Sequence, residues 1–452
     1  MKSEHIKSII LSTLVAISLV LSYSLLSYQP AYDVIQNSNY DYVQNVQIGA
    51  KKQFKNVLVP TELIVHEANN HYLTTKQNNI LPLYRALQKT DISSFDNITS
   101  KTSLESYQTI TKGKNKVEII FPTLIPIETL NKVLNLDTKR LQNVLFDRMI
   151  ITLSSKQDDS TKIYFANESL NVLYEAVFDN SQVIPAIEKV KNNFDHYIQY
   201  SKFELETGKV IYLPKKTVKL KTIEYLTTDI SIDKLKDAIF YDPSKVRKES
   251  SNSGDTFTDG TRLMTVSQLN RSLTFVNPTT AEDNSQSPSS LVERSFEFVN
   301  QHGGWTDNYI LSSIQPDKSE VSFRFYVNNL PVYKNATIST RLGTDDVQTF
   351  KRPLYKFGYR MEKNESEVEL MSGSQIMEVI KNNKSINDTL IKDISLGYET
   401  IFNSEKEATM NQPYYSRAVE LKPVWIIHYG DSYKKIDQDM FSRIGVNIVG
   451  LE

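Results

Sequence analysis

The chain contains no cysteine, so it forms neither disulfide bonds nor thiolate metal sites. Its 52 basic and 53 acidic residues give a net charge of −1, without the basic excess that binding to nucleic acid phosphates requires. It has no phosphate-binding loop and no dinucleotide-binding glycine motif. These absences exclude thiol chemistry, nucleic acid binding and the common nucleotide-binding enzymes. The lack of cysteine also fits a protein outside a Gram-positive-type cell.

Long apolar runs are scarce as well, and residues 9–28 form the single clear one, without a charged side chain. At ~1.5 Å per residue, a helix over this run spans ~30 Å, the thickness of a bilayer's hydrocarbon core. Lys2 and Lys7 precede it, which favours a cytoplasmic N-terminus. A cleavable signal peptide, the alternative, has a shorter apolar region and a small-x-small site. We therefore predict a cytoplasmic tail (1–8) and a retained transmembrane helix (9–28) of a single-pass cell-membrane protein.

Small side chains recur every four residues on this predicted helix. Ser8, Ser12 and Ala16 share one face, and Ser18 and Ser22 share another. Small residues let membrane helices approach closely, so both faces are candidate contacts with partner helices. The alternative is that the helix merely tolerates these serines.

The remaining residues are too many for one hydrophobic core and predict several domains of the α+β class. We expect antiparallel sheets with helices packed on one face. The predicted parts are a juxtamembrane spacer (29–47), an N-terminal domain (48–166), a middle domain (167–284) and a C-terminal domain (285–452).

Local patterns predict individual helices in these domains. Apolar residues at helical spacing predict an amphipathic helix over 183–194. Ser231 and Ser287 are expected N-caps, and Ser372 with Gln375 predicts a capping box.

Other patterns predict strands and loops. Alternating apolar residues predict strands over 321–327 and 419–429. Pro126 is expected to begin a helix whose apolar face continues towards Leu145, and the polar stretch 248–260 is expected to be a loop.

The most tempting chemical motif is His66-Glu67-Ala68-Asn69-Asn70-His71. A zincin places two histidines four residues apart on one helix face. Here the spacing is five, which turns the second imidazole ~140° away from the first on a helix. We therefore expect a polar loop or strand end, with no metal site. No other histidine or serine lies in a nucleophile motif, so no catalytic residue and no cofactor is predicted.

Trp305 and Trp425 are the two tryptophans, and they are candidate interface residues because aromatic side chains often anchor interfaces. Core packing is the favoured alternative, since tryptophan is usually well buried.

Taken together, the start of the chain and several short motifs resemble the YycH family, also called WalH. The matching segments are KSEHIKSIILSTLVAISLVLS at 2–22, YDPS at 241–244, TDGT at 258–261, HGGW at 302–305, NLPVY at 329–333 and KPVW at 422–425.

The resemblance implies a non-enzymatic, membrane-anchored regulator with a three-domain extracytoplasmic body and a C-terminal domain like the smaller protein YycI. Its implied partners are YycI (WalI) and the cell-wall-controlling sensor histidine kinase WalK (YycG), whose activity it would modulate through transmembrane and extracytoplasmic contacts. The family offers no catalytic residues to carry over.

Two other functions stay open. The C-terminal pattern also resembles small α+β modules of protease propeptides, which suggests an extracytoplasmic inhibitor or chaperone of secreted enzymes. A membrane-tethered wall hydrolase is the third class, which the lack of catalytic motifs disfavours.

Overall fold

A computed structural model describes residues 7, 11, 13–22, 47–138, 141, 143–153, 162–179, 181–206, 208–252, 254–283, 285–383, 386–402, 418–436 and 448–450. The chain divides into two compact units, Met1–Tyr42 and Val43–Glu452. In the first unit the described residues, 7, 11 and 13–22, are helical.

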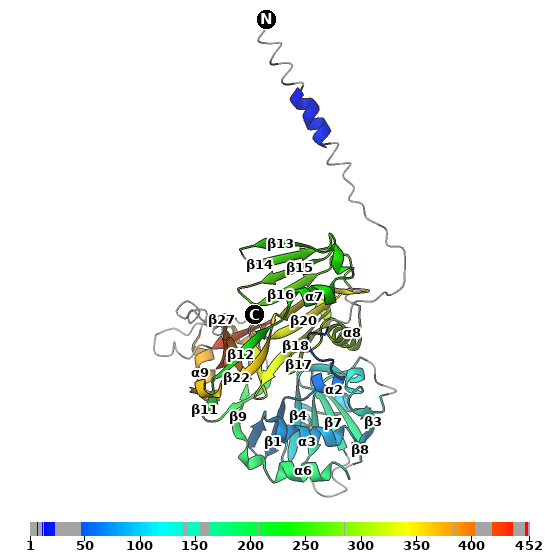
Figure 1. The fold of residues 1–452 in the computed structure, drawn as a ribbon. Coiled ribbons are helices and arrows are strands. Elements are labelled where there is room, and N and C mark those ends of the chain that lie inside the picture. The colour runs from blue at the N-terminus through cyan, green and yellow to red at the C-terminus, as the bar shows by residue number, and fades with distance from the viewer. Residues whose placement is uncertain are drawn as a thin grey trace. The chain divides into compact units, whose positions relative to one another are not determined.

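Ten strands of the second unit form a mainly antiparallel sheet, the N-terminal sheet (Figure 1). Its central strands are neighbours in space although they are distant in the chain. The order is β10 (Val210–Pro214), β9 (Ile198–Glu204), β2 (Asn70–Thr74), β1 (Glu62–Glu67), β4 (Lys116–Pro126), β6 (Leu145–Thr152), β7 (Lys162–Asn167), β8 (Val172–Phe178), β3 (Asp91–Asn97) and β5 (Asn135–Leu136).

The two faces of the N-terminal sheet have different roles. On β1, Leu63 and Val65 belong to the main core together with residues of α3 (Gln77–Leu87) and α6 (Ile184–Lys191). Because side chains alternate along a strand, Glu62, Ile64 and His66 lie on the opposite face. α4 (Leu104–Lys112) covers one part of that face through Tyr107. The short helices α2 (Phe54–Val57) and α5 (Ile127–Leu130) complete this region.

A second sheet of fifteen strands, the C-terminal sheet, contains most of the later strands. Its main path runs β13 (Arg247–Ser251), β14 (Gly254–Thr258), β15 (Leu263–Ser267), β16 (Ser272–Val276), β21 (Val347–Pro353), β20 (Thr337–Leu342), β18 (Glu320–Val327), β19 (Leu330–Tyr333), β24 (Ile391–Phe402), β25 (Ala418–Tyr429), β12 (Ile223–Asp229) and β22 (Tyr355–Arg360). β17 (Tyr309–Gln315) pairs with β18, β26 (Ser432–Ile436) with β25, and β27 (Ile448–Gly450) with β26. β11 (Val218–Lys221) and β23 (Glu367–Leu370) form a separate pair.

Helices of this part begin where the sequence predicts. Ser231 accepts a backbone hydrogen bond at the start of α7 (Ile232–Ile239), and Ser287 does so at α8 (Pro288–Gln301). Ser372 and Gln375 form the predicted capping box of α9 (Gly373–Asn382). Short 3₁₀ helices lie at Thr99–Lys101, Phe194–His196, Pro243–Lys245, Pro316–Lys318, Glu362–Asn364 and Asp388–Leu390.

The mixed α+β class is confirmed, with far more strand than helix. Two local predictions are wrong. The helix at Pro126 ends after one turn, at Leu130, because the chain continues into β5 and then β6. The stretch predicted as a loop forms the hairpin β13–β14, since backbone pairing does not require apolar side chains. The three-domain division stays a prediction, and strands on both sides of its first boundary share the N-terminal sheet.

Candidate functional site

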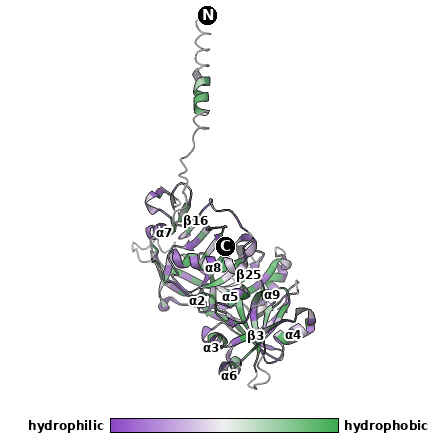
Figure 2. Cartoon of the chain, turned by 90° about the vertical axis from the view of Figure 1, so that its right-hand side faces the viewer, coloured by the Kyte–Doolittle hydropathy of each residue, from purple (hydrophilic) through white to green (hydrophobic). Residues whose placement is uncertain are grey.

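The predicted transmembrane segment lies partly outside the described residues. Ser8 and Ser12 are outside them, whereas Ala16, Ser18 and Ser22 lie on the described helix, which is mainly apolar in Figure 2. Its large apolar side chains are half to two-thirds exposed, from Ile17 at 51% to Leu19 at 67%. Among the described residues, no helix combines the length and the apolar character needed to cross a membrane.

Both tryptophans lie in the core, so the structure corrects their candidacy as surface anchors. Trp305 is 2% exposed and Trp425 is fully buried. The indole N–H of Trp305 donates to Asn300 Oδ1 at 2.8 Å, and that of Trp425 donates to the Met371 carbonyl at 3.1 Å. Each buried N–H is therefore satisfied inside the protein, as the core-packing alternative expects.

The histidine motif lies at the ends of two hairpin strands, as the strand-end expectation has it, but both of its histidines are buried. Glu67 ends β1, Asn70 begins β2, and the two-residue turn contains Ala68 at φ 53°. This register places His66 directly opposite His71. Their Nδ1 atoms are 2.7 Å apart, and the side chain of Tyr212 packs against both imidazoles. A spacing of five that separates two side chains on a helix brings them together across a tight hairpin.

His66 also connects this hairpin to a buried charge. Its Nε2 lies 2.8 Å from Glu118 Oε1 on β4, and both side chains are fully buried. A carboxylate accepts hydrogen bonds only, so His66 Nε2 donates. In the neutral state His66 Nδ1 is then the acceptor, and His71 Nδ1 donates to it.

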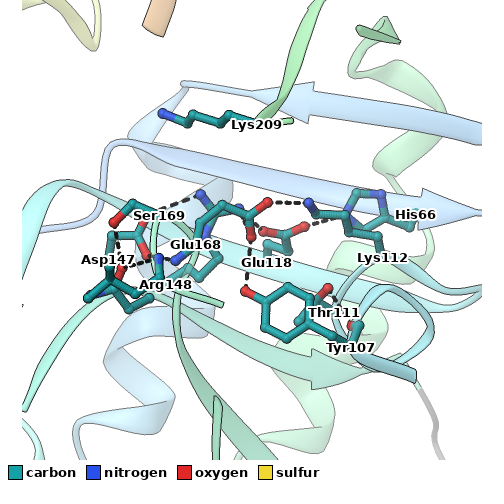
Figure 3. A network of polar contacts seen from close by, with 12 residues as sticks. His66, Tyr107, Thr111, Lys112, Glu118, Asp147, Arg148, Glu168, Ser169 and Lys209 are labelled. Atoms are coloured by element: carbon teal, nitrogen blue, oxygen red, sulfur yellow. Dashed lines mark hydrogen bonds and ion pairs between the residues drawn. The ribbon is translucent and has the colours of Figure 1, made fainter. Parts of the chain in front are cut away.

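The charge of Glu118 is balanced by Arg148, whose Nη1 donates to Glu118 Oε2 at 2.6 Å (Figure 3). Arg148 also contacts Asp147 at 3.0 Å and Glu168 at 3.5 Å. Lys112 of α4 donates to the Glu168 carboxylate.

The network ends on α4, where the Tyr107 hydroxyl donates to Glu168 Oε2 at 3.1 Å. We call this set the buried network: His66, His71, Tyr107, Lys112, Glu118, Asp147, Arg148 and Glu168. It joins β1, β2, β4, β6 and α4 on one face of the N-terminal sheet.

The electrostatics of the network favour one protonation state. Burial alone would raise the pKa of Glu118, but the Arg148 charge and the hydrogen bond from His66 outweigh burial and lower the pKa to about 2. Burial, followed by the neighbouring His66, lowers the pKa of His71 to about 4. At neutral pH the network therefore holds an ionised Glu118 beside a neutral His71.

A cavity of about 750 Å³ lies between the N-terminal and C-terminal sheets. Glu62 on β1 and Tyr200 on β9 line it from the first sheet, and Tyr326 on β18 and Asp393 on β24 line it from the second. Burial, with Asp393 next in importance, raises the pKa of Glu62 to about 7. Burial also raises the pKa of Asp393.

The side chains of the buried network and of the cavity are suited to stabilising the fold and to binding a ligand. In the described part of the chain, no group of three or more histidine, aspartate or glutamate side chains is arranged to hold a metal ion. In the buried network each charged group has an opposite partner: Arg148 pairs with Glu118 and Asp147, and Lys112 pairs with Glu168. The cavity is of the size typical of small-molecule sites.

Comparison with known proteins identifies the chain's relatives. Residues 4–198 match the sequence model of the YycH protein N-terminal domain, and residues 208–443 match that of the YycH protein C-terminal domain. The two-component system WalR/WalK regulatory protein YycH of Bacillus subtilis (strain 168) is 24% identical over 463 residues, covering 99% of both chains. The crystal structure of YycH from Bacillus subtilis superimposes with a TM-score of 0.75 at 21% identity, covering 87% of this chain and 99% of that one.

These sequence matches define a regulatory protein of a two-component system rather than an enzyme. The chain belongs to the YycH family.

Sequence reasoning missed the partners of the histidines. Glu118 and Arg148 each interrupt an apolar strand pattern, in KVEIIF and FDRMIIT. A charged residue within a buried strand requires a buried partner, so these interruptions were the available signal. The identity of the partners depends on strand order, which the local sequence does not contain.

Proposed function

We propose that this chain is a non-enzymatic, membrane-anchored regulatory protein that modulates the sensor histidine kinase WalK (YycG) together with YycI (WalI). Its N-terminus would lie in the cytoplasm and its folded body outside the cell. The observation that carries the proposal is the end-to-end match to a protein described as a WalR/WalK regulator.

The amino-terminal segment supports a role in the membrane. Residues 9–28 carry no charge, and the apolar side chains of the described helix have no covering partner within the described part of that unit. In a bilayer such a helix would be solvated by lipid, and small residues would be the places where another helix can pack closely. Ser8, Ser12 and Ala16 on one face, and Ser18 and Ser22 on another, are the proposed contacts.

The mechanism we propose is a shift of a conformational equilibrium. A kinase with active and inactive arrangements of its transmembrane helices responds only to a partner that binds the two states with different affinity. A difference of about 1–3 kcal/mol would change kinase activity several-fold to about a hundredfold. The folded body would contribute contacts outside the membrane and would fix the orientation of the anchor.

The test exchanges small residues of the anchor for a larger one. The double change Ser12→Leu and Ala16→Leu should weaken association with WalK in the membrane by about tenfold, because it prevents close packing of the helices. Association is measured by energy transfer between labelled full-length proteins in bilayers. Ile17→Leu, which keeps the volume and lies on another face, is the matched control.

Two outcomes would contradict the proposal. Unchanged association of the double variant would remove these helix faces as contacts. A body cut after Pro30 that keeps the full regulatory effect would show that the membrane helix is not needed. Capture of the full-length protein from membranes, followed by mass spectrometry, tests directly whether WalK and YycI are the partners.

A further inference from the structure

Two carboxyl groups, one from each sheet, line the cavity between the sheets. Glu62 comes from the N-terminal sheet and Asp393 from the C-terminal sheet. In the described part of the chain, neither carboxylate accepts a hydrogen bond or an ion pair from another side chain within bonding distance. Their raised pKa values follow from burial and, for Glu62, from the nearby Asp393.

The cationic side chains that line the same cavity are already engaged. Arg148 belongs to the buried network, and Lys209 donates to the Lys392 carbonyl at 2.5 Å. Lys392 pairs with Asp431 at 3.2 Å. Arg324 stacks on two tyrosine rings, 4.0 Å from the centre of Tyr333 and 4.8 Å from that of Tyr433. The charges of Arg148 and Lys209 lower the pKa values of Glu62 and Asp393, but burial outweighs both charges, so each carboxyl group would gain from a further cation in the cavity.

Two buried tyrosines provide an independent sign of a ligand site. Tyr200 is 9% exposed and Tyr326 is 7% exposed, and both line the cavity. Neither hydroxyl has a hydrogen-bond partner among the described residues. Both lie close enough to Glu62 for its charge to raise their pKa values, in addition to the larger effect of burial. The hydroxyl of Tyr212, which also lines the cavity, is buried without a hydrogen-bond partner; since buried hydroxyl groups normally find one, it points to a molecule that enters the cavity.

We propose that this cavity binds a small organic ligand through a primary ammonium group, held by Glu62 and Asp393 and by the hydroxyl groups of Tyr200 and Tyr326. An ammonium group has three donors and no acceptor, which complements carboxylates and hydroxyls. The tyrosine rings also offer faces to a cation. A metal ion is the poorer candidate, since two carboxylates from different sheets provide too few ligands.

The ligand would connect the two sheets, because each supplies one carboxylate. It would also lie near the buried network, since Tyr212 lines the cavity and packs on both His66 and His71. This inference does not rest on the proposed kinase partner.

The experiment measures binding of simple probes to the full chain in detergent, by isothermal titration calorimetry. 1,4-Diaminobutane is the primary amine probe, and 1,4-butanediol is its neutral counterpart of similar shape. Tetramethylammonium tests charge without donors, and Mg²⁺ tests a metal ion. We expect the diamine to bind with 1:1 stoichiometry and a Kd below about 1 mM, and the other probes to bind at least about tenfold more weakly.

Variants locate the site. Glu62→Gln and Asp393→Asn should each weaken diamine binding by about tenfold or more, since each removes a charge-assisted hydrogen bond. Tyr200→Phe and Tyr326→Phe should weaken it less. Glu105→Gln, a change at an exposed carboxylate on α4, is the matched control and should leave binding unchanged. Thermal unfolding of each variant confirms that it is folded.

Several results would overturn the proposal. Absence of saturable diamine binding up to about 10 mM would exclude an amine site of useful affinity. Equal binding by butanediol would show that the ammonium charge is not recognised. If the diamine still binds to folded protein after both carboxylate changes, its site lies elsewhere. If Mg²⁺ binds more tightly than the diamine, the cavity is a metal site and not a site for an organic cation.

Discussion

Replacing Glu118 with glutamine tests whether the buried network stabilises the fold as an ionic unit. Glutamine has nearly the same shape, so packing is kept while the charge is lost. Arg148 would then remain buried with Asp147 and Glu168 but without its shortest partner, at 2.6 Å. His66 Nε2 would face a neutral amide instead of a carboxylate.

The expected loss can be worked out in two ways. Breaking a buried ion pair from one side typically costs about 3–5 kcal/mol. Independently, the pKa of Glu118 falls from 4.5 to about 2 on folding. At about 1.4 kcal/mol per pKa unit, this corresponds to about 3 kcal/mol. Because the folded pKa is lowered, this stability is present above pH 4.5 and is lost as the pH falls towards 2.

The assay is urea unfolding of the full chain in detergent, followed by circular dichroism between pH 3 and pH 7. At pH 7, Glu118→Gln should unfold with a free energy about 3 kcal/mol lower than the parent. This difference should shrink below pH 4.5, because Glu118 of the unfolded parent then binds a proton while the folded parent keeps the ionised carboxylate down to about pH 2. Glu105→Gln on the exposed face of α4 is the control and should stay within about 0.5 kcal/mol.

A double-mutant cycle with Arg148→Met completes the test. Each single change leaves a buried charge without its partner, whereas the double variant removes both. The double variant should therefore lose less than the sum of the two single changes, by more than about 1 kcal/mol. A loss below about 1 kcal/mol for Glu118→Gln at pH 7, or additive losses in the cycle, would refute the reasoning.

Two further predictions concern the cavity and the hairpin β13–β14. Glu62→Gln should raise the free energy of unfolding at pH 8 by up to about 3 kcal/mol and leave it unchanged at pH 4.5. The reason is that folding raises the pKa of Glu62 from 4.5 to about 7, so the parent loses stability as the pH rises through about 7. Urea unfolding at both pH values measures this, and an equal effect at both would contradict the assigned cause. Gly254→Ala should lower stability by about 1–3 kcal/mol, since Gly254 has φ +147° and an added Cβ would meet the Val266 carbonyl oxygen at 1.9 Å. Gly260→Ala is the matched control for backbone strain alone, because Gly260 has φ +98° and open space around it. An equal loss of stability in both variants would show that the close contact at Gly254 has no effect of its own.

The correct local predictions share one property. The N-caps Ser231, Ser287 and Ser372 act on backbone groups three residues away, and the alternation over 321–327 reports burial of a single strand. These interactions are local in the chain, so the sequence order contains them directly. The same local reasoning failed for 248–260, where a polar composition concealed the β13–β14 hairpin.

The buried network and the cavity were beyond sequence reasoning. Glu118 is 52 residues from His66 and 30 residues from Arg148, so the local sequence does not show that they meet. The spacing of the two histidines was judged by helical geometry, whereas these residues face each other in a hairpin. The sequence left open whether the two tryptophans lie at the surface or in the core, and the structure shows that both are buried in the core.

The sequence by itself determined the apolar amino-terminal run, the α+β class, the helix starts and the family resemblance, because these depend on residue types and on short spacings. The tertiary structure decided which charges meet inside the N-terminal sheet and which carboxylates face the cavity between the sheets. The physical reason is that strand order and register set those encounters, and both depend on the packing of the whole body rather than on any one segment.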